Sequence, residues 1–432
     1  MSLLFRIDLR DLVFSTLTIN SPYYNSFLVG PPNIFTTRNR ADHTSKRKAI
    51  AHIFSTTSLG HFEEYIKTHI VAFIRRMDQF AEGKLREKGG GPDANTFDIA
   101  PWFHYVAFDI ISDLAFGRSL GMLASGSDIA EARLTPDSPT IYVPAITLLS
   151  TRTKANSVIG TIPDLIPYAK YIPEPNLKKS LADGAKFNAI AVACVKQRLE
   201  GRASDRKDVL QGLINAKNED GQSMGLPELT AEALAQLVGG SDTSSNTMCT
   251  LIFYCATTEG VWKKLRAELD GAVPADVEFP THEMTRNLPY LDSVLKETLR
   301  FHSLLGLGLP REVPPESPGL SILGHDFPPG TVLSVPSYTI HHSKEIWGSD
   351  AGVFRPDRWL NGELTTRQKN AFTPFSVGPR ACIGRNLAEM EMKMITATLA
   401  RRYTMVAKQQ ELVYTQGFLR KPDQVLMELQ RR

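Results

Sequence analysis

One cysteine near the end of the chain has neighbours that could make it chemically reactive. Cys382 lies in residues 375–384, which have the pattern Phe-x-x-Gly-x-Arg-x-Cys-x-Gly, and apolar residues at helical spacing follow directly. A thiol at a helix N-terminus, with Arg380 nearby, is favoured as a thiolate that could bind a metal or act as a nucleophile. Gly378 and Gly384 would permit tight turns and the close approach of a flat ligand. The alternative is a buried structural cysteine after a turn.

A second unusual stretch lies inside a long apolar segment, which is expected to be a helix from Thr230, its N-cap, to about Glu259. Residues 239–244 are two glycines followed by four small polar residues, among them Asp242 and Thr243. Each glycine in a helix interior is unfavourable by on the order of 1 kcal/mol. Such a local violation is expected at a functional site, although a kink or the close packing of another helix would also explain it.

Two pairs of charged residues are weaker indications of a functional site. His43 and Arg47 are four residues apart on one face of a predicted helix, where they could form an anion site or a solvated basic face. Glu297 and Arg300 are three residues apart in a predicted helix over 291–301, and such a pair alone is usually a surface ion pair.

Together these stretches resemble the cytochrome P-450 superfamily. The pattern around Cys382 is similar to its haem-binding loop, and residues 239–244 are similar to its oxygen-binding segment. Glu-x-x-Arg at 297–300 is followed by Phe-Arg-Pro-Asp-Arg-Trp at 354–359, which resembles the family's Arg-Trp element. Each motif is weak or moderate alone, but all four stand in the family's order.

The resemblance implies haem b as the cofactor, with the Cys382 thiolate as the iron ligand, which in such proteins favours O–O cleavage. It implies that Thr243 hydrogen-bonds the oxygen and that Asp242 helps to relay protons. It also implies that Arg358 completes a buried triad with Glu297 and Arg300. The other residues implied at the haem are Phe375 and Gly384 and, as partners of the propionates, His43, Arg47, Arg311 and Arg380.

The same resemblance implies a monooxygenase that uses O2 and takes electrons from NADPH through an NADPH-cytochrome P-450 reductase. Lys46, Lys48 and Arg385 are candidates for the docking face of that reductase. Other haem-based hypotheses are a non-catalytic truncated haem-binding protein and an isomerase or peroxygenase that needs no reductase. The Asp242-Thr243 pair argues against both, because it points to oxygen activation.

Several segments, among them 34–38, 167–171 and 338–348, resemble fungal benzoate para-hydroxylases. This resemblance implies aromatic hydroxylation of benzoate or a related small acid, and a fungal secondary-metabolite hydroxylase is the alternative. An anionic substrate needs a cationic or hydrogen-bonding partner in an apolar pocket, for which the candidates are Arg38, Arg40 and Tyr24. Residues 417–419 resemble the hairpin tip that closes the family's substrate cavity.

The composition of the chain excludes several classes of protein. The 432 residues are 42% hydrophobic and 22% charged, which is ordinary for a globular protein, and a net charge of +3 is too small to indicate nucleic-acid binding. The four cysteines include no CxxC pair, which argues against zinc or a disulfide framework. No run approaches the roughly 20 apolar residues of a membrane span. We expect a single domain over 1–432 without the family's membrane anchor and first helix, located in the cytoplasm or peripherally at the endoplasmic reticulum membrane.

The expected fold is mainly α, an α-rich α+β arrangement around the long central helix. Amphipathic periodicity predicts helices over 57–83, 97–117 and 176–200, with a glycine-rich separator at 89–92. Residues 118–175 are expected to be loop-rich and 201–225 to be a linker. Short strands are predicted at 5–15 and 331–334.

Overall fold

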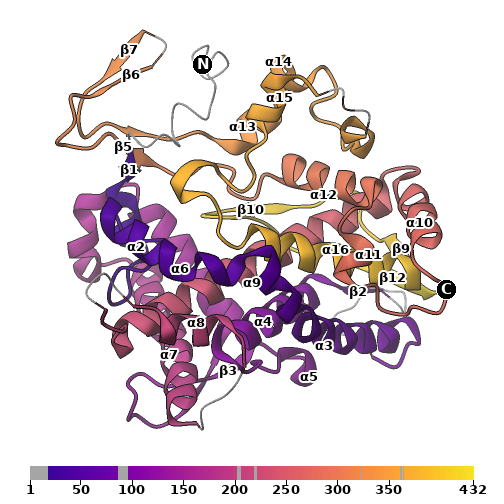
Figure 1. Cartoon of the computed structure of the whole chain (residues 1–432), viewed down its shortest axis with the longest axis horizontal. Helices are drawn as coiled ribbons and strands as arrows, with labels where there is room; N and C mark the ends of the chain where they lie inside the picture. Colours follow the sequence, from indigo (N-terminus) through magenta and orange to yellow (C-terminus); the bar gives the residue numbers. More distant parts are fainter. Residues whose placement is uncertain are drawn as a thin grey trace.

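Helices make up most of the chain, as expected, and the part of the chain that the structure describes also forms five small sheets (Figure 1). The computed structural model describes residues 18–85, 96–201, 206–217, 221–322, 324–360, 362 and 364–432. The strand predicted at 5–15 and the separator at 89–92 lie outside these residues. The longer helices are α2 (Arg40–Ala51), α3 (Thr56–Ala81), α4 (Ala100–Phe116), α6 (Ala145–Ile159), α7 (Pro175–Glu200), α9 (Leu226–Thr257), α10 (Val261–Ala272), α12 (Pro289–His302) and α16 (Arg385–Arg402).

Shorter helical segments connect these helices. They are η1 (Pro22–Phe27), η2 (His52–Phe54), α5 (Met122–Ser125), η3 (Pro163–Tyr171), α8 (Val209–Asn215), α11 (His282–Thr285), α13 (Ser337–His341), α14 (Lys344–Trp347), η4 (Pro356–Trp359), α15 (Thr366–Ala371) and η5 (Gly378–Arg380).

All strand pairs of the described residues are antiparallel. Two of these sheets have three strands. In the first, the order is β1 (Ile19–Asn20), β5 (Arg311–Glu312) and β8 (Val332–Leu333). In the second, the order is β2 (Thr96–Asp98), β12 (Leu426–Arg431) and β9 (Tyr403–Ala407). The others are two-stranded: β3 (Ile129–Ala132) with β4 (Ile141–Pro144), β6 (Leu320–Ile322) with β7 (His325–Phe327), and β10 (Tyr414–Gln416) with β11 (Arg420–Pro422).

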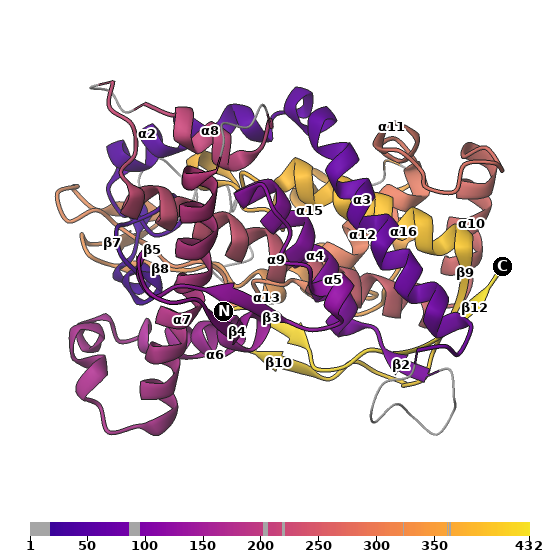
Figure 2. The same ribbon diagram turned by 90° about the horizontal axis from the view of Figure 1, so that it is seen from below.

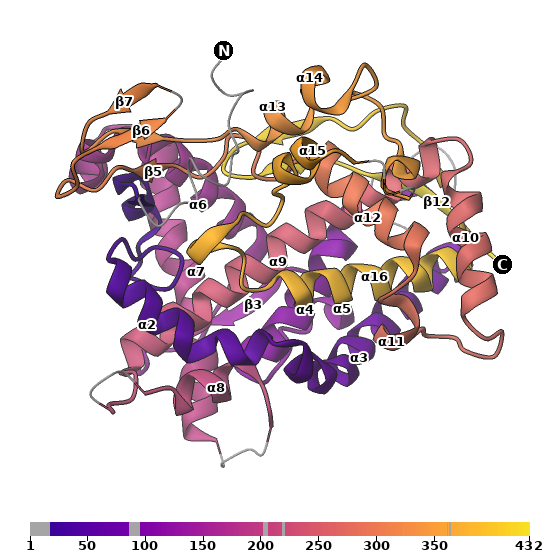
Figure 3. The same ribbon diagram turned by 45° about the horizontal axis from the view of Figure 1, so that its top comes forward.

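The helix α9 runs through the middle of the molecule and organises the core. It packs against α4 and α7, and α3 in turn lies on α4 across the face seen in Figure 2. On its other side α12 and α16 pack against it, and Figure 3 shows α16 beside it. A Cβ on Gly240 would lie 2.5 Å from Ile111 on α4, so this glycine permits the close approach of α4. Close packing, one of the two structural alternatives for the glycine pair, therefore accounts for Gly240.

The predicted N-terminus of α9 was wrong, because Thr230 is not its N-cap. The helix begins at Leu226 with Gly225 as its N-cap. Pro227 suits the first turn, because a backbone N–H at that position has no acceptor within the helix and proline lacks this group. Thr230 lies inside the helix, where its hydroxyl donates to the Leu226 carbonyl at 2.8 Å.

The segment predicted to be loop-rich contains a full helix, α6. Its buried side chains include Arg152, Thr153 and Asn156, so its buried face is partly polar and leaves no apolar stripe for the sequence to reveal. The predicted linker at 201–225 likewise contains α8, a helix too short for periodicity to detect. Among the described residues, no helix combines the length and the apolar character that crossing a bilayer requires.

Candidate functional site

A cavity of about 350 Å³ lies between α9 and the loop that precedes α16, within the size range of small-molecule sites. All the residues predicted to be catalytic or to bind the cofactor line it. They come from α2, α9, β5 and the loop: His43, Arg47, Asp242, Thr243, Arg311, Phe375, Arg380, Cys382 and Gly384.

The loop that carries Cys382 is held in shape by its own backbone. The Cys382 N–H donates to the Phe375 carbonyl at 2.8 Å, which closes the loop. Gly378 has φ +73°, a left-handed conformation that favours glycine. Helix α16 begins at Arg385 with Gly384 as its N-cap, so Cys382 lies just before a helix N-terminus, as predicted. Protein surrounds Cys382, yet its side chain keeps accessible surface because it faces the cavity.

Burial works against the thiolate that the helix N-terminus and Arg380 were expected to favour at Cys382. Burial raises the pKa of its thiol above the usual value. The Gly384 and Arg385 N–H groups lower that pKa, as the sequence suggested, and so does a nearby guanidinium, but it is that of Arg47 rather than that of Arg380. Burial outweighs these effects. A metal bound to the sulfur is the group that would remove this proton.

Two glycines leave room for a flat group next to the cysteine. A Cβ built on Gly239 of α9 or on Gly384 of the loop would meet no atom within 4 Å, and both residues line the cavity. Side chains at these positions would project into the space between helix and loop, so the two glycines keep that space open.

Three guanidinium groups and one imidazole meet on one side of the cavity, which we call the cationic cluster (His43, Arg47, Arg311, Arg380). Within the described residues, the hydrogen-bond partners of the three guanidinium groups are neutral. Arg47 donates to the Ala381 carbonyl at 2.8 Å and Arg380 to the Thr37 carbonyl at 2.8 Å. Arg311 donates to the Tyr24 hydroxyl at 3.1 Å and to the side-chain oxygen of Asn20.

The cationic cluster is electrostatically unsatisfied. Burial and the neighbouring Arg311 lower the pKa of Arg380 to about 10. Burial and then Arg380 lower the pKa of His43 to about 4. Such mutual repulsion is relieved by an anion, and planar guanidinium groups suit carboxylates.

The α9 wall presents a hydroxyl and a carboxylate. The Thr243 hydroxyl faces the cavity and donates to the Gly239 carbonyl at 2.7 Å. Asp242 is buried and ion-paired with Lys421 of β11. On the same carboxylate, the Asn246 amide donates to Oδ1 at 3.1 Å, and Nδ1 of His104 lies 3.7 Å from this oxygen.

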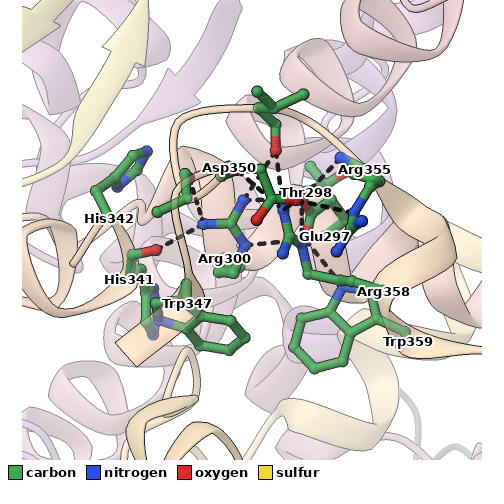
Figure 4. A network of polar contacts seen from close by, with 12 residues as sticks. Glu297, Thr298, Arg300, His341, His342, Trp347, Asp350, Arg355, Arg358 and Trp359 are labelled. Carbon is green, nitrogen blue, oxygen red and sulfur yellow. Dashed lines mark hydrogen bonds and ion pairs between the residues drawn. The ribbon is translucent and has the colours of Figure 1, made fainter. Parts of the chain in front are cut away.

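The predicted triad lies outside the cavity and is fully formed (Figure 4). Glu297 and Arg300 are 0% exposed and Arg358 is 7% exposed. Arg300 binds Glu297 in a bidentate manner, through Nη2 to Oε1 at 2.8 Å and Nε to Oε2 at 2.9 Å. The Arg358 Nε donates to Glu297 Oε1 at 3.0 Å, and the Trp359 indole donates to Oε2 at 2.9 Å.

The triad is connected to the cysteine loop through His341. Nη1 of Arg300 donates to the His341 carbonyl at 2.6 Å. The Thr373 N–H, two residues before Phe375, donates to Nε2 of His341 at 3.4 Å. The triad therefore supports the segment that positions Cys382.

Some sequence-based suggestions do not fit the structure. Lys46 is buried and ion-paired with Glu228 at 2.5 Å and Glu232 at 3.1 Å, so it cannot form part of a docking face. Arg38 pairs with Glu312 at 2.5 Å, and neither Arg38 nor Arg40 lines the cavity. Tyr24 does line it, but its hydroxyl contacts Arg311 of the cationic cluster.

Two charged residues of the cavity wall were missed. Arg152 lies on α6, which was read as loop, so no face could be assigned to it. Glu391 lies on α16, where burial raises its pKa to about 8 and one carboxyl oxygen has no hydrogen-bond partner. The alternation of Glu and Met around Glu391 gave no sign that this side chain is buried.

A cysteine facing an open space, an opposing wall of glycine and threonine, and an unsatisfied cationic cluster fit a haem-thiolate protein with two haem carboxylates. The comparison of sequences agrees: the family model for cytochrome P-450 matches residues 9–429. The chain belongs to the cytochrome P-450 family.

Three relatives of the chain, all from fungi, show how similar individual members of the family are to it. The chain is 46% identical to the benzoate 4-monooxygenase of Aspergillus niger over 418 residues, which are 96% of this chain and 80% of that protein. It is 30% identical to a cytochrome P-450 monooxygenase of Aspergillus terreus, over 90% of this chain and 77% of that protein. It is 28% identical to pisatin demethylase of Fusarium vanettenii, over 88% of this chain and 71% of that protein.

Proposed function

We propose that this monooxygenase hydroxylates benzoate, or a closely related small aromatic acid, at the para position, with electrons from NADPH delivered by a flavoprotein reductase. The observation that carries the substrate is the 46% identity to benzoate 4-monooxygenase over 96% of the chain. The cavity supports it, because aromatic side chains of Tyr24, Phe27, Phe35 and Phe418 line one part of its wall.

The residues proposed to hold the haem surround the open space described above. The Cys382 thiolate would ligate the iron, and the cationic cluster would bind the propionates. Phe375, Gly239 and Gly384 would border the macrocycle. Bound haem supplies the activation of O2 and the transfer of one oxygen atom to the substrate, while the protein supplies orientation and proton control.

The proposed proton path uses two adjacent residues of α9. The Thr243 hydroxyl can exchange its bond to the Gly239 carbonyl for a bond to a group in the cavity. Asp242 would hold the next proton, and Lys421 and Asn246 fix the orientation of its carboxylate. A haem-binding protein without turnover needs neither group. Lys48 and Arg385 remain exposed and stay candidates for the reductase-docking face.

Benzoate binding tests the substrate directly. Added benzoate should change the spin state of the haem iron by displacing water from the cavity, with saturation in the micromolar to low-millimolar range that is typical of enzyme substrates. The measurement is a difference-absorbance titration, followed by identification of the product made with NADPH and reductase. Absence of both a spin shift and 4-hydroxybenzoate would remove the benzoate assignment and leave the monooxygenase class intact.

Thr243→Ala should separate NADPH consumption from hydroxylation. Without the hydroxyl, proton delivery in the cavity is no longer ordered, and the yield of product per NADPH should fall about tenfold or more. The measurement compares NADPH oxidised, product formed and peroxide released. Thr243→Ser, which keeps the hydroxyl, is the matched control. A fully coupled Thr243→Ala enzyme would contradict the proposed role.

A further inference from the structure

We propose that Arg152 of α6 binds the carboxylate of the aromatic substrate and sets its orientation in the cavity. This inference rests on the proposed function, because it takes the substrate to be an aromatic acid. Arg152 is assigned no part in holding the haem, and it belongs to none of the sequence motifs described above.

Arg152 is buried, lines the cavity and has a large unused capacity for hydrogen bonds. It is 7% exposed. Of its five N–H donors, one is used by the Phe27 carbonyl, at 2.6 Å from Nη2, and no other group of the described residues accepts a hydrogen bond from Arg152. Buried guanidinium groups normally pair with anions, because the uncompensated charge is strongly unfavourable.

No carboxylate of the described residues compensates this charge. Burial alone lowers the pKa of Arg152 to about 10, with no charged neighbour among the causes. The side-chain stem packs against Gly184 of α7, where an added Cβ would lie 3.4 Å from Cδ. The neighbouring Asp183 is buried but forms no ion pair with Arg152.

Arg152 is also separate from the cationic cluster. The charges of Arg47, Arg311 and Arg380 affect one another or His43, and none of them affects Arg152. Two haem carboxylates can therefore be bound by the cluster, and Arg152 remains for the carboxylate of another molecule.

The surroundings of Arg152 suit an aromatic ring. The residue whose carbonyl accepts from Arg152 is Phe27, and its ring centroid lies 4.8 Å from that of Phe418 and 5.8 Å from that of Phe35. All three rings line the cavity. Aromatic pairs at these distances are favourable, and a substrate ring can extend the group.

This placement gives a reason for para selectivity. In benzoate, the para carbon is the ring atom farthest from the carboxylate. With the carboxylate anchored at α6, the para carbon is the part of the substrate that extends farthest into the cavity, and the ortho and meta carbons lie nearer Arg152.

The test measures binding of benzoate and of its neutral isostere benzamide to the haem-loaded enzyme, by calorimetry and by spin-state titration. The wild-type protein should bind benzoate at least tenfold more tightly than benzamide. Arg152→Gln should weaken benzoate binding by about 30-fold or more and leave benzamide binding within a few fold, so that the preference disappears. Lys154→Gln, which removes a cation from the exposed side of the same helix, should keep the preference.

Different results overturn different claims. Failure of the wild-type protein to bind benzoate removes the substrate assignment and this inference with it. If the wild type binds benzoate and Arg152→Gln keeps the preference, or weakens both ligands in parallel, Arg152 has a structural role and only this inference fails. Should Arg152→Gln not fold, a wild-type preference of less than tenfold for benzoate over benzamide overturns the inference without any variant.

Discussion

Cys382→Ala should abolish the thiolate signature of the haem and the monooxygenase activity. The reduced carbon monoxide adduct of the wild-type protein should have the strongly red-shifted Soret band of thiolate ligation, because Cys382 is the only cysteine among the cavity-lining residues that the structure describes. Alanine offers no ligand, so this band should be absent and product formation should fall by at least about 1,000-fold, as expected when a group that carries the chemistry is removed.

The matched control for this variant is Cys194→Ala on α7. Cys194 is buried like a core residue, and burial raises the pKa of its thiol to about 11, which marks it as inert. Its variant should keep the red-shifted band and the activity, with at most a modest loss of stability from the small cavity that it leaves. A histidine-type spectrum in the wild-type protein, or a red-shifted band in Cys382→Ala, would contradict the assignment of the ligand.

The sequence indicated which residues line the cavity more exactly than it indicated where the surrounding helices begin and end. Cys382, Thr243 and Arg311 lie far apart in the chain, and each was identified from its own short motif, because chemistry restricts which residue types can stand at such positions. Their meeting around one cavity depends on α9 and β5, which the sequence could place only approximately. The helix α9 itself was predictable because it is long and its sequence is apolar.

Features that the sequence did not reveal, such as α6 and the burial of Lys46, share a physical cause. Helix α6 buries polar residues such as Arg152, so its pattern carries no apolar face, and nothing in the sequence placed Arg152 at the cavity. Lys46 was taken as exposed because lysine usually is, but its burial depends on Glu228 and Glu232, which follow about 180 residues later. Partners so distant in sequence leave no local signal.

Glu297→Gln should lower the free energy of unfolding by about 3–5 kcal/mol, because it leaves the charges of Arg300 and Arg358 buried without their common partner. That is a large share of the roughly 5–15 kcal/mol by which a domain is stable. The variant should accumulate poorly and retain little haem. Chemical denaturation followed by haem absorbance and by circular dichroism measures the loss.

The chain contains its own control for this prediction. Glu283 and Arg286 have the same spacing as Glu297 and Arg300 and the same Nη2–Oε1 distance of 2.8 Å, but their side chains are 71% and 48% exposed. An exposed pair of this kind contributes well under about 1 kcal/mol, so Glu283→Gln should be nearly neutral.

The two variants, Glu297→Gln and Glu283→Gln, also test how the triad affects the loop that carries Cys382. Because Arg300 bonds the His341 carbonyl and His341 bonds Thr373, the loop of Cys382 should loosen before the helical core unfolds. Haem absorbance of Glu297→Gln should then be lost at a lower denaturant concentration than helical circular dichroism. Equal stability of Glu297→Gln and Glu283→Gln would show that burial does not strengthen this pair. Coincident transitions in Glu297→Gln would show instead that the triad stabilises the whole fold rather than the loop.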